Sequence, residues 1–157
     1  MATVRPAVLD DAEGCVEVLR QLPGYFTPET HADARVAIGR HRAWIATEAN
    51  CVVGFLVAER RFPRSAEITF AAVSPEHRGH GVGTALVVQA LGELAGEGVA
   101  IVEVKTLDSS SGYEPYAATR AFWERRGFVQ IDCIDPIPGW QPGNPSAIYV
   151  AALTPTT

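Results

Sequence analysis

The sequence has no uninterrupted apolar run long enough for a membrane helix, and its N-terminus, Met1–Arg5, has no apolar signal core. A membrane-spanning helix needs roughly 20 consecutive apolar residues, and a secretory signal needs an apolar stretch behind a basic end. We therefore expect no membrane association and no export, and a cytoplasmic location.

Cysteine is scarce: Cys15, Cys51 and Cys133 are odd in number, far apart and outside any Cys-x-x-Cys spacing. Free thiols in a reducing compartment are the simplest interpretation. The four histidines are equally scattered, so no metal site is expected. They are His31, His41, His77 and His80.

Basic residues are outnumbered, with 13 Lys and Arg against 18 Asp and Glu, for a net charge of −5. This balance argues against general nucleic-acid binding and favours a cationic substrate or partner. A chain of 157 residues, 47% hydrophobic, has the length and composition of one domain, 1–157, with a real core.

Hydrophobic periodicity predicts a mixed α/β fold with about seven strands and four helices. Strands are expected at 3–8, 43–48, 51–59, 66–73, 99–106, 128–134 and 147–153, and helices at 12–21, 28–41, 84–95 and 116–126. The strand–helix–strand segment 66–106 should pair its strands in parallel, whereas the hairpins near both ends should be antiparallel.

Three alternating glycines, Gly79, Gly81 and Gly83, lie between a predicted strand and a predicted helix. Such a stretch can form a cradle of backbone N–H groups for phosphate at a helix N-terminus, or it can be a flexible turn. A P-loop is excluded because no lysine follows the glycines. A dinucleotide fingerprint is excluded because the third glycine position is Thr84 or Leu86.

The pattern Arg78-x-x-Gly81-x-Gly83, preceded by Val73-x-Pro75, resembles the acyl-CoA signature of the GCN5-related N-acetyltransferase (GNAT) superfamily. A second block, 116–128, resembles the family's helix that ends in an aromatic residue, a Glu and a closing Gly-Phe. The predicted order of elements is similar to the GNAT fold along nearly the whole chain.

This resemblance implies acetyl-CoA as co-substrate, with no metal. The implied cofactor-binding residues are Ala71, Ala72, Val73, Arg78, Gly79, His80, Gly81, Val82, Gly83 and Thr84. In the family the Val73 backbone would pair with pantetheine, and the Ala71 N–H would polarise the thioester carbonyl as an oxyanion donor. Gly79 to Thr84 would hold the pyrophosphate.

Glu67 is the candidate general base, because the resemblance places a Glu six residues before the strand-ending valine. Regular alternation would put 67, 69, 71 and 73 on one face, and burial would raise the carboxyl pKa towards that of a useful base. The alternatives are a solvated Glu and a carboxylate that only binds the substrate cation.

Trp123 stands where many family members have a Tyr that protonates the departing thiolate, and an indole N–H is no usable acid. Tyr116 is the first substitute and Tyr149 the second, although both can be packing residues. A Tyr116 acid with a depressed pKa would give a basic limb at about pH 8–9. We expect Trp123 to fill core space, with Phe122 on the other side of its helix.

Tyr25 and Phe26 lie in the loop that lines the acceptor site in this family, and Trp140 lies in a late loop with the same two interpretations, substrate binding or core cover. A set of arginines on the last predicted helix could meet the CoA phosphates of the family's co-substrate, although a solvated helix face is the simpler explanation. They are Arg120, Arg125 and Arg126.

The resemblance thus implies an N-acetyltransferase that transfers acetyl directly from acetyl-CoA to an amine, as a monomer or homodimer. Two alternatives remain: a non-catalytic acyl-CoA-binding domain and a nucleotide-binding α/β module. The acceptor amine is not indicated by the sequence.

Overall fold

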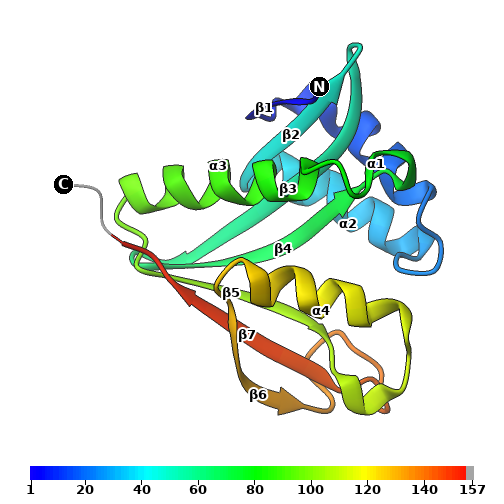
Figure 1. The fold of residues 1–157 in the computed structure, drawn as a ribbon, viewed down its shortest axis with the longest axis vertical. Coiled ribbons are helices and arrows are strands. Elements are labelled where there is room, and N and C mark those ends of the chain that lie inside the picture. Colours follow the sequence, from blue (N-terminus) through cyan, green and yellow to red (C-terminus); the bar gives the residue numbers. More distant parts are fainter. Residues whose placement is uncertain (155–157) are drawn as a thin grey trace.

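The computed structural model describes residues 1–154 and shows seven strands and four helices in the predicted order (Figure 1). The strands are β1 (Thr3–Pro6), β2 (Arg42–Glu48), β3 (Cys51–Phe62), β4 (Ser65–Val73), β5 (Ile101–Leu107), β6 (Val129–Ile134) and β7 (Ser146–Ala152). The helices are α1 (Ala12–Arg20), α2 (Pro28–Arg40), α3 (Val82–Gly96) and α4 (Pro115–Arg125).

All seven strands form one sheet in the order β1-β2-β3-β4-β5-β7-β6. The pair β4 and β5, joined by α3, is parallel, and every other neighbouring pair is antiparallel. The mixed sheet and its antiparallel hairpins are therefore confirmed. β7 lies between β5 and β6, because the chain returns to the sheet through the loop 135–145.

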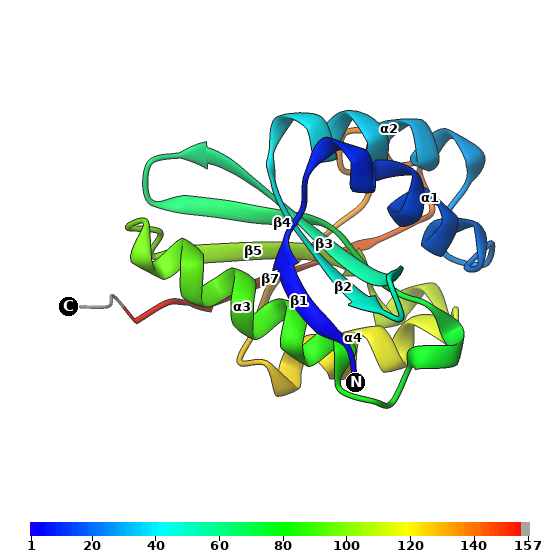
Figure 2. The same cartoon turned by 90° about the horizontal axis from the view of Figure 1, so that it is seen from above.

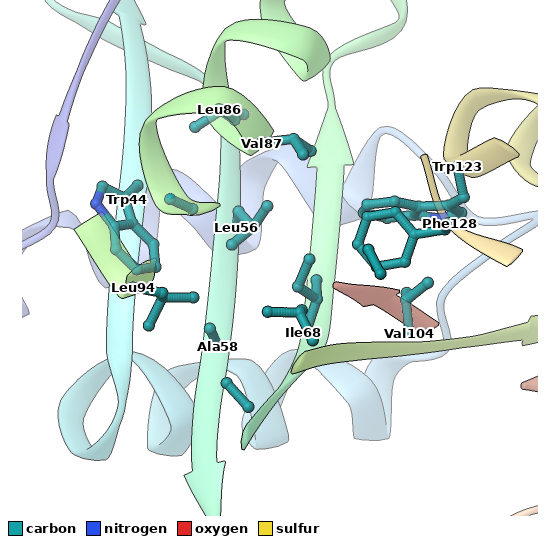
Figure 3. Packing of buried hydrophobic residues seen from close by; sticks show 14 of the residues in the cluster. Trp44, Leu56, Ala58, Ile68, Leu86, Val87, Leu94, Val104, Trp123 and Phe128 are labelled. Atoms are coloured by element: carbon teal, nitrogen blue, oxygen red, sulfur yellow. The ribbon is translucent and has the colours of Figure 1, made fainter. Parts of the chain in front are cut away.

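The helices cover both faces of the sheet: α1 and α2 lie on one side, and α3 and α4 on the other (Figure 2). Two hydrophobic clusters reflect this arrangement. On the α3/α4 face, Trp44 and Leu56 of the sheet pack with Leu86 and Leu94 of α3 (Figure 3). On the α1/α2 face, the helices pack on inner residues of β2 to β4, including Phe55.

β4 contains a bulge that reverses its alternation. Ile68 belongs to the cluster on the α3/α4 face, yet Phe70, two residues later, packs on the α1/α2 face. The register with β3 shifts at this point, because Ala58 pairs with Ile68 and Val57 with Phe70, which leaves Thr69 as the extra residue. A bulge of this kind kinks the strand and increases its twist.

The bulge corrects one expectation. Glu67 precedes Ile68 and therefore lies on the α1/α2 face, the face of Phe70. Val73 packs on the α3/α4 cluster, and Ala71, two residues earlier, shares its face. The prediction that residues 67, 69, 71 and 73 lie on one face is wrong, because regular alternation does not extend across an unpaired residue.

Candidate active site

A cleft of about 1180 Å³ opens where β4 and β5 separate. The two strands pair only through Ser65–Ile68 and Ile101–Val104. Beyond these residues β4 continues through 69–73 with no partner strand on its β5 side. The separation begins at the bulged Thr69, so we attribute it to the bend that the bulge introduces.

The unpaired edge of β4 turns two backbone groups towards the cleft. The Ser74 N–H donates to the Val53 carbonyl of β3 at 2.8 Å, so Ser74 faces β3. Backbone N–H directions alternate along a strand, and therefore the N–H groups of Ala71 and Val73 face the gap. The Ala72 N–H faces β3, and its side chain is buried on the α1/α2 face.

The glycine turn leaves free amides at the N-terminus of α3. Gly79 and Gly81 have φ of +77° and +79°, a conformation that costs glycine little. The Ala85 N–H donates to the Gly81 carbonyl at 2.9 Å, which starts the helical hydrogen-bond ladder. The N–H groups of residues 82–84 have no helical partner, and the N-cap, Gly81, has no side chain to bind them. This end of α3 is suited to an anion.

Gly83 has a different role from its neighbours. A Cβ at this position would lie 3.1 Å from Phe122 Cε1, so glycine permits the close approach of α4 to α3. His80 is exposed and does not line the cleft. The other predicted cofactor-binding residues do line it: Ala71, Ala72, Val73, Arg78, Gly79, Gly81, Val82, Gly83 and Thr84.

Two arginines of the α4 segment line the cleft, and the first of them is also exposed, as expected of a solvated face. They are Arg125 and Arg126. The Arg126 guanidinium donates to Thr84 Oγ1 and lies 4.7 Å from the centre of the Phe122 ring. Arg120 instead donates to the Leu107 carbonyl at 2.8 Å. We call Gly79 and residues 81–84, with Arg125 and Arg126, the glycine end of the cleft.

Arg126 could have been found from spacing. It follows Phe122 by four residues, which places the two side chains on one face of a helix. It was not singled out from Arg120 and Arg125, because the sequence alone does not show that the Phe122 face packs on Gly83.

Glu67 is 9% exposed and does not line the cleft. Its Oε1 lies 2.8 Å from Arg61 Nη1 and 3.5 Å from Nζ of Lys105, which does line the cleft. Lys105 is also 3.3 Å from Glu103. Burial raises the pKa of Glu67, although Lys105 and Arg61 both oppose the rise. Glu67 thus has two cationic partners, and only Lys105 of the two lines the cleft.

Tyr25 and Tyr116 meet in an aromatic cluster that joins the α1–α2 loop to the start of α4. Their ring centres lie 5.1 Å apart, and Tyr113 lies 5.8 Å from Tyr116. Arg78 is 5.2 Å from the centre of the Tyr25 ring, which links this cluster to the glycine turn. All three tyrosines line the cleft.

Burial raises the pKa of Tyr116, with smaller contributions from Tyr25 and Tyr113. The expectation of a depressed pKa for Tyr116 is therefore wrong, because the cluster that surrounds it is aromatic and provides no cation to stabilise a phenolate.

Tyr149 and Trp123 are core residues. The Tyr149 hydroxyl donates to Glu124 at 2.9 Å and the side chain does not line the cleft, which argues against a role as substitute acid. Trp123 is 4% exposed and lies 5.0 Å from Phe122 and 5.1 Å from Phe128, in edge-to-face contact with both rings. Trp123 fills core space as expected, but Phe122 lies beside it and not across the helix.

A second group of aromatic side chains lines the cleft beyond the aromatic cluster. Phe26 follows Tyr25 in the α1–α2 loop, Phe70 lies on β4, and Trp140 lies in the late loop. We call this part, with Tyr25 and Tyr113, the aromatic end of the cleft.

Within residues 1–154, no three His, Cys, Asp or Glu side chains lie close enough together to hold a metal ion. Across the same part of the chain, no helix has the length and apolar character needed to cross a membrane.

Comparison with known proteins identifies the family of the chain. The family described as the acetyltransferase (GNAT) domain matches residues 39–130, more than half of the chain. The chain therefore belongs to the GNAT family. No curated protein sequence matches it.

Solved structures of this family share the whole fold. A GNAT-family protein from Desulfovibrio desulfuricans superposes with a TM-score of 0.85 at 22% identity, covering 98% of this chain and 100% of that one. The ribosomal-protein-S18-alanine N-acetyltransferase from Escherichia coli has a TM-score of 0.78 at 18% identity, covering 100% and 97%. An aminoglycoside 6'-N-acetyltransferase in complex with coenzyme A has 0.76 at 17%, covering 99% of each chain. At identities this low, the likeness shows a shared fold alone.

Proposed function

We propose that this protein is an acetyl-CoA-dependent N-acetyltransferase that transfers acetyl directly to an amine. The observation that carries the proposal is the unpaired edge of β4, whose Ala71 and Val73 N–H groups face a cleft that leads to the free amides of α3. An extended chain that ends in phosphates fits this sequence of groups, with strand-like hydrogen bonds first and an anion site after them.

In this proposal the glycine end holds the pyrophosphate. The amides of residues 82–84 and the dipole of α3 face the phosphates, and Arg126, already bound to Thr84, adds a positive charge. Val73 pairs with the pantetheine arm, and the Ala71 N–H donates to the thioester oxygen as negative charge develops there.

Glu67 is the proposed proton acceptor. The amine must lose a proton before or during attack, and a carboxylate with a raised pKa can take it. Because Glu67 lies behind Lys105, the proton would pass through water and not by direct contact. Tyr116 is the proposed donor to the departing thiolate, since its raised pKa keeps the phenol protonated.

A non-catalytic acyl-CoA-binding domain is the second candidate. It is favoured by the two ion pairs that hold Glu67 outside the cleft and by the buried Trp123 at the usual position of the acid. The two candidates share the cofactor site and differ only in turnover.

Two measurements test the proposal: the first tests the cofactor site that both candidates share, and the second separates the candidates. Calorimetry should show acetyl-CoA binding that ATP does not displace, because the site includes an edge for pantetheine that a nucleotide alone does not use. Thiol release should then exceed background for at least one member of a panel of primary amines. Binding without any release would support the non-catalytic domain, and displacement by ATP with equal affinity would refute both.

A further inference from the structure

The aromatic end of the cleft differs from the glycine end in the kind of surface that it offers. Its lining comes from four segments far apart in the chain: the α1–α2 loop, β4, the loop between β5 and α4, and the late loop. The five aromatic residues there are Tyr25, Phe26, Phe70, Tyr113 and Trp140. Phe55 and Phe70 stack with ring centres 6.3 Å apart. A surface of this kind binds apolar groups by burial and aromatic contact.

The charges of the cleft have one sign. Within residues 1–154 no Asp or Glu lines it, and its ionisable lining consists of His77, Arg78, Lys105, Arg125 and Arg126, with the tyrosines. Glu67, which approaches from behind Lys105, is already bound by both Lys105 and Arg61. A second ammonium group on the acceptor would lose its hydration here without gaining a carboxylate partner, which is costly.

The acidic side chains that give the chain its net negative charge therefore do not line the cleft. The carboxylates lie elsewhere, many of them in surface ion pairs such as Glu13 with Arg35 and Glu17 with Arg20. The expectation of a cationic substrate from net charge alone does not account for where the charges lie.

From these observations we infer the acceptor class: a single amine carried on an aromatic or large aliphatic body, and not a polycation. The inference rests on the proposed function, because it takes the aromatic end as the place where the amine meets the thioester. The amine itself reaches the gap between β4 and β5, while its apolar body packs on the aromatic side chains.

The test compares matched amines on the intact protein. Phenethylamine is compared with its para-aminomethyl derivative, which has the same body and a second ammonium group, and with spermidine as an aliphatic polycation. We expect kcat/KM for phenethylamine to exceed that of either polycation on the order of 10²-fold, as an unpaired buried charge requires. Equal or better use of either polycation would overturn the inference.

A variant tests the charge argument directly. Thr30 of α2 lines the aromatic end and is half-buried. Thr30→Glu supplies the missing carboxylate and should shift the preference towards the para-aminomethyl derivative about tenfold. Thr30→Gln has the same length without the charge and should keep the wild-type preference. An unchanged preference in Thr30→Glu would show that charge does not set the selectivity.

The inference about the acceptor can also be tested when no turnover is found. If no amine releases thiol, the proposed transfer fails, and calorimetry on the coenzyme A-saturated protein then decides the inference alone. Tighter binding of phenethylamine than of its dicationic derivative supports it. Equal binding of the two, or binding of neither, refutes it.

Discussion

At the glycine end of the cleft the ligand space is bounded by backbone amides and arginines, whereas at the aromatic end it is bounded by side chains from four separate segments. The amides are fixed by one short stretch of chain, in which Gly79 and Gly81 provide the positive φ that the turn requires. The aromatic end exists only after the sheet and both helical layers have formed. A binding site made of backbone amides from one stretch of chain suits a constant ligand, such as a cofactor. A surface made of side chains from several segments can be altered by single substitutions to suit a different acceptor.

The largest expected effect concerns Glu67, the proposed proton acceptor, which lies behind Lys105 and outside both ends of the cleft. Glu67→Gln keeps the shape of the side chain and removes its basicity, so transfer at neutral pH should fall on the order of 10²-fold. Burial raises the pKa of Glu67, so its carboxylate takes up a proton at a higher pH than an ordinary Glu does. As the pH is lowered, the wild-type rate should therefore begin to fall above the ordinary pKa range of a Glu. The variant should recover partly as pH rises and free amine appears. Steady-state pH–rate profiles provide the measurement.

Glu103→Gln is the matched control for this variant, because Glu103 also contacts Lys105 and carries the same charge. A purely electrostatic role through Lys105 would make the two variants behave alike. If Glu67→Gln keeps the wild-type rate at every pH, the role of Glu67 is structural and not catalytic.

The next effect sharpens the glycine end. Arg126→Gln removes the cation beside Thr84, and acetyl-CoA affinity should fall about tenfold, equivalent to ~1.4 kcal/mol. The loss should shrink at high salt, because screening weakens charge–phosphate attraction. Calorimetric titration at two salt concentrations measures both effects.

Arg120→Gln is the control on the same helix, since Arg120 binds the Leu107 carbonyl and does not line the cleft. It should leave affinity close to wild type. Equal losses in the two variants would mean that net charge, and not the position of Arg126, attracts the cofactor.

A smaller effect is expected at Tyr116, in the aromatic cluster that it forms with Tyr25 and Tyr113. Tyr116→Phe removes the proposed proton donor, and kcat should fall severalfold, less than for Glu67, because a thiolate with a pKa of about 8.5 leaves without much assistance. Burial raises the pKa of Tyr116 above its ordinary value, so the variant should lose no limb near neutral pH. Tyr113→Phe, in the same cluster, is the comparison. A wild-type kcat in Tyr116→Phe would leave water as the donor.

The two ends also differ in how far the sequence predicted them. The glycine end could be read from residues 73–84, since the strand, turn and helix are contiguous and each glycine restricts the geometry. The bulge at Thr69 could not, because no glycine or proline marks it and it depends on the register with β3. The aromatic end was predicted only through Tyr25, Phe26 and Trp140, because Phe70 and Tyr113 reach it through tertiary packing.

The smallest expected effect concerns Gly83, where the glycine end joins the core. A methyl group here would lie 3.1 Å from Phe122, which is confined by Trp123 at 5.0 Å and by Arg126 at 4.7 Å and cannot easily move aside. Overpacking of this kind costs about 1–3 kcal/mol, against a gain of up to ~1 kcal/mol when Ala replaces Gly within a helix. Gly83→Ala should therefore lower the free energy of unfolding by about 1 kcal/mol, measured by urea denaturation. Phe122→Leu removes the close ring atoms, so in that background the same change should become neutral or stabilising. A Gly83→Ala cost that is the same in both backgrounds would show that strain within the turn, and not contact with α4, is the reason for glycine at this position.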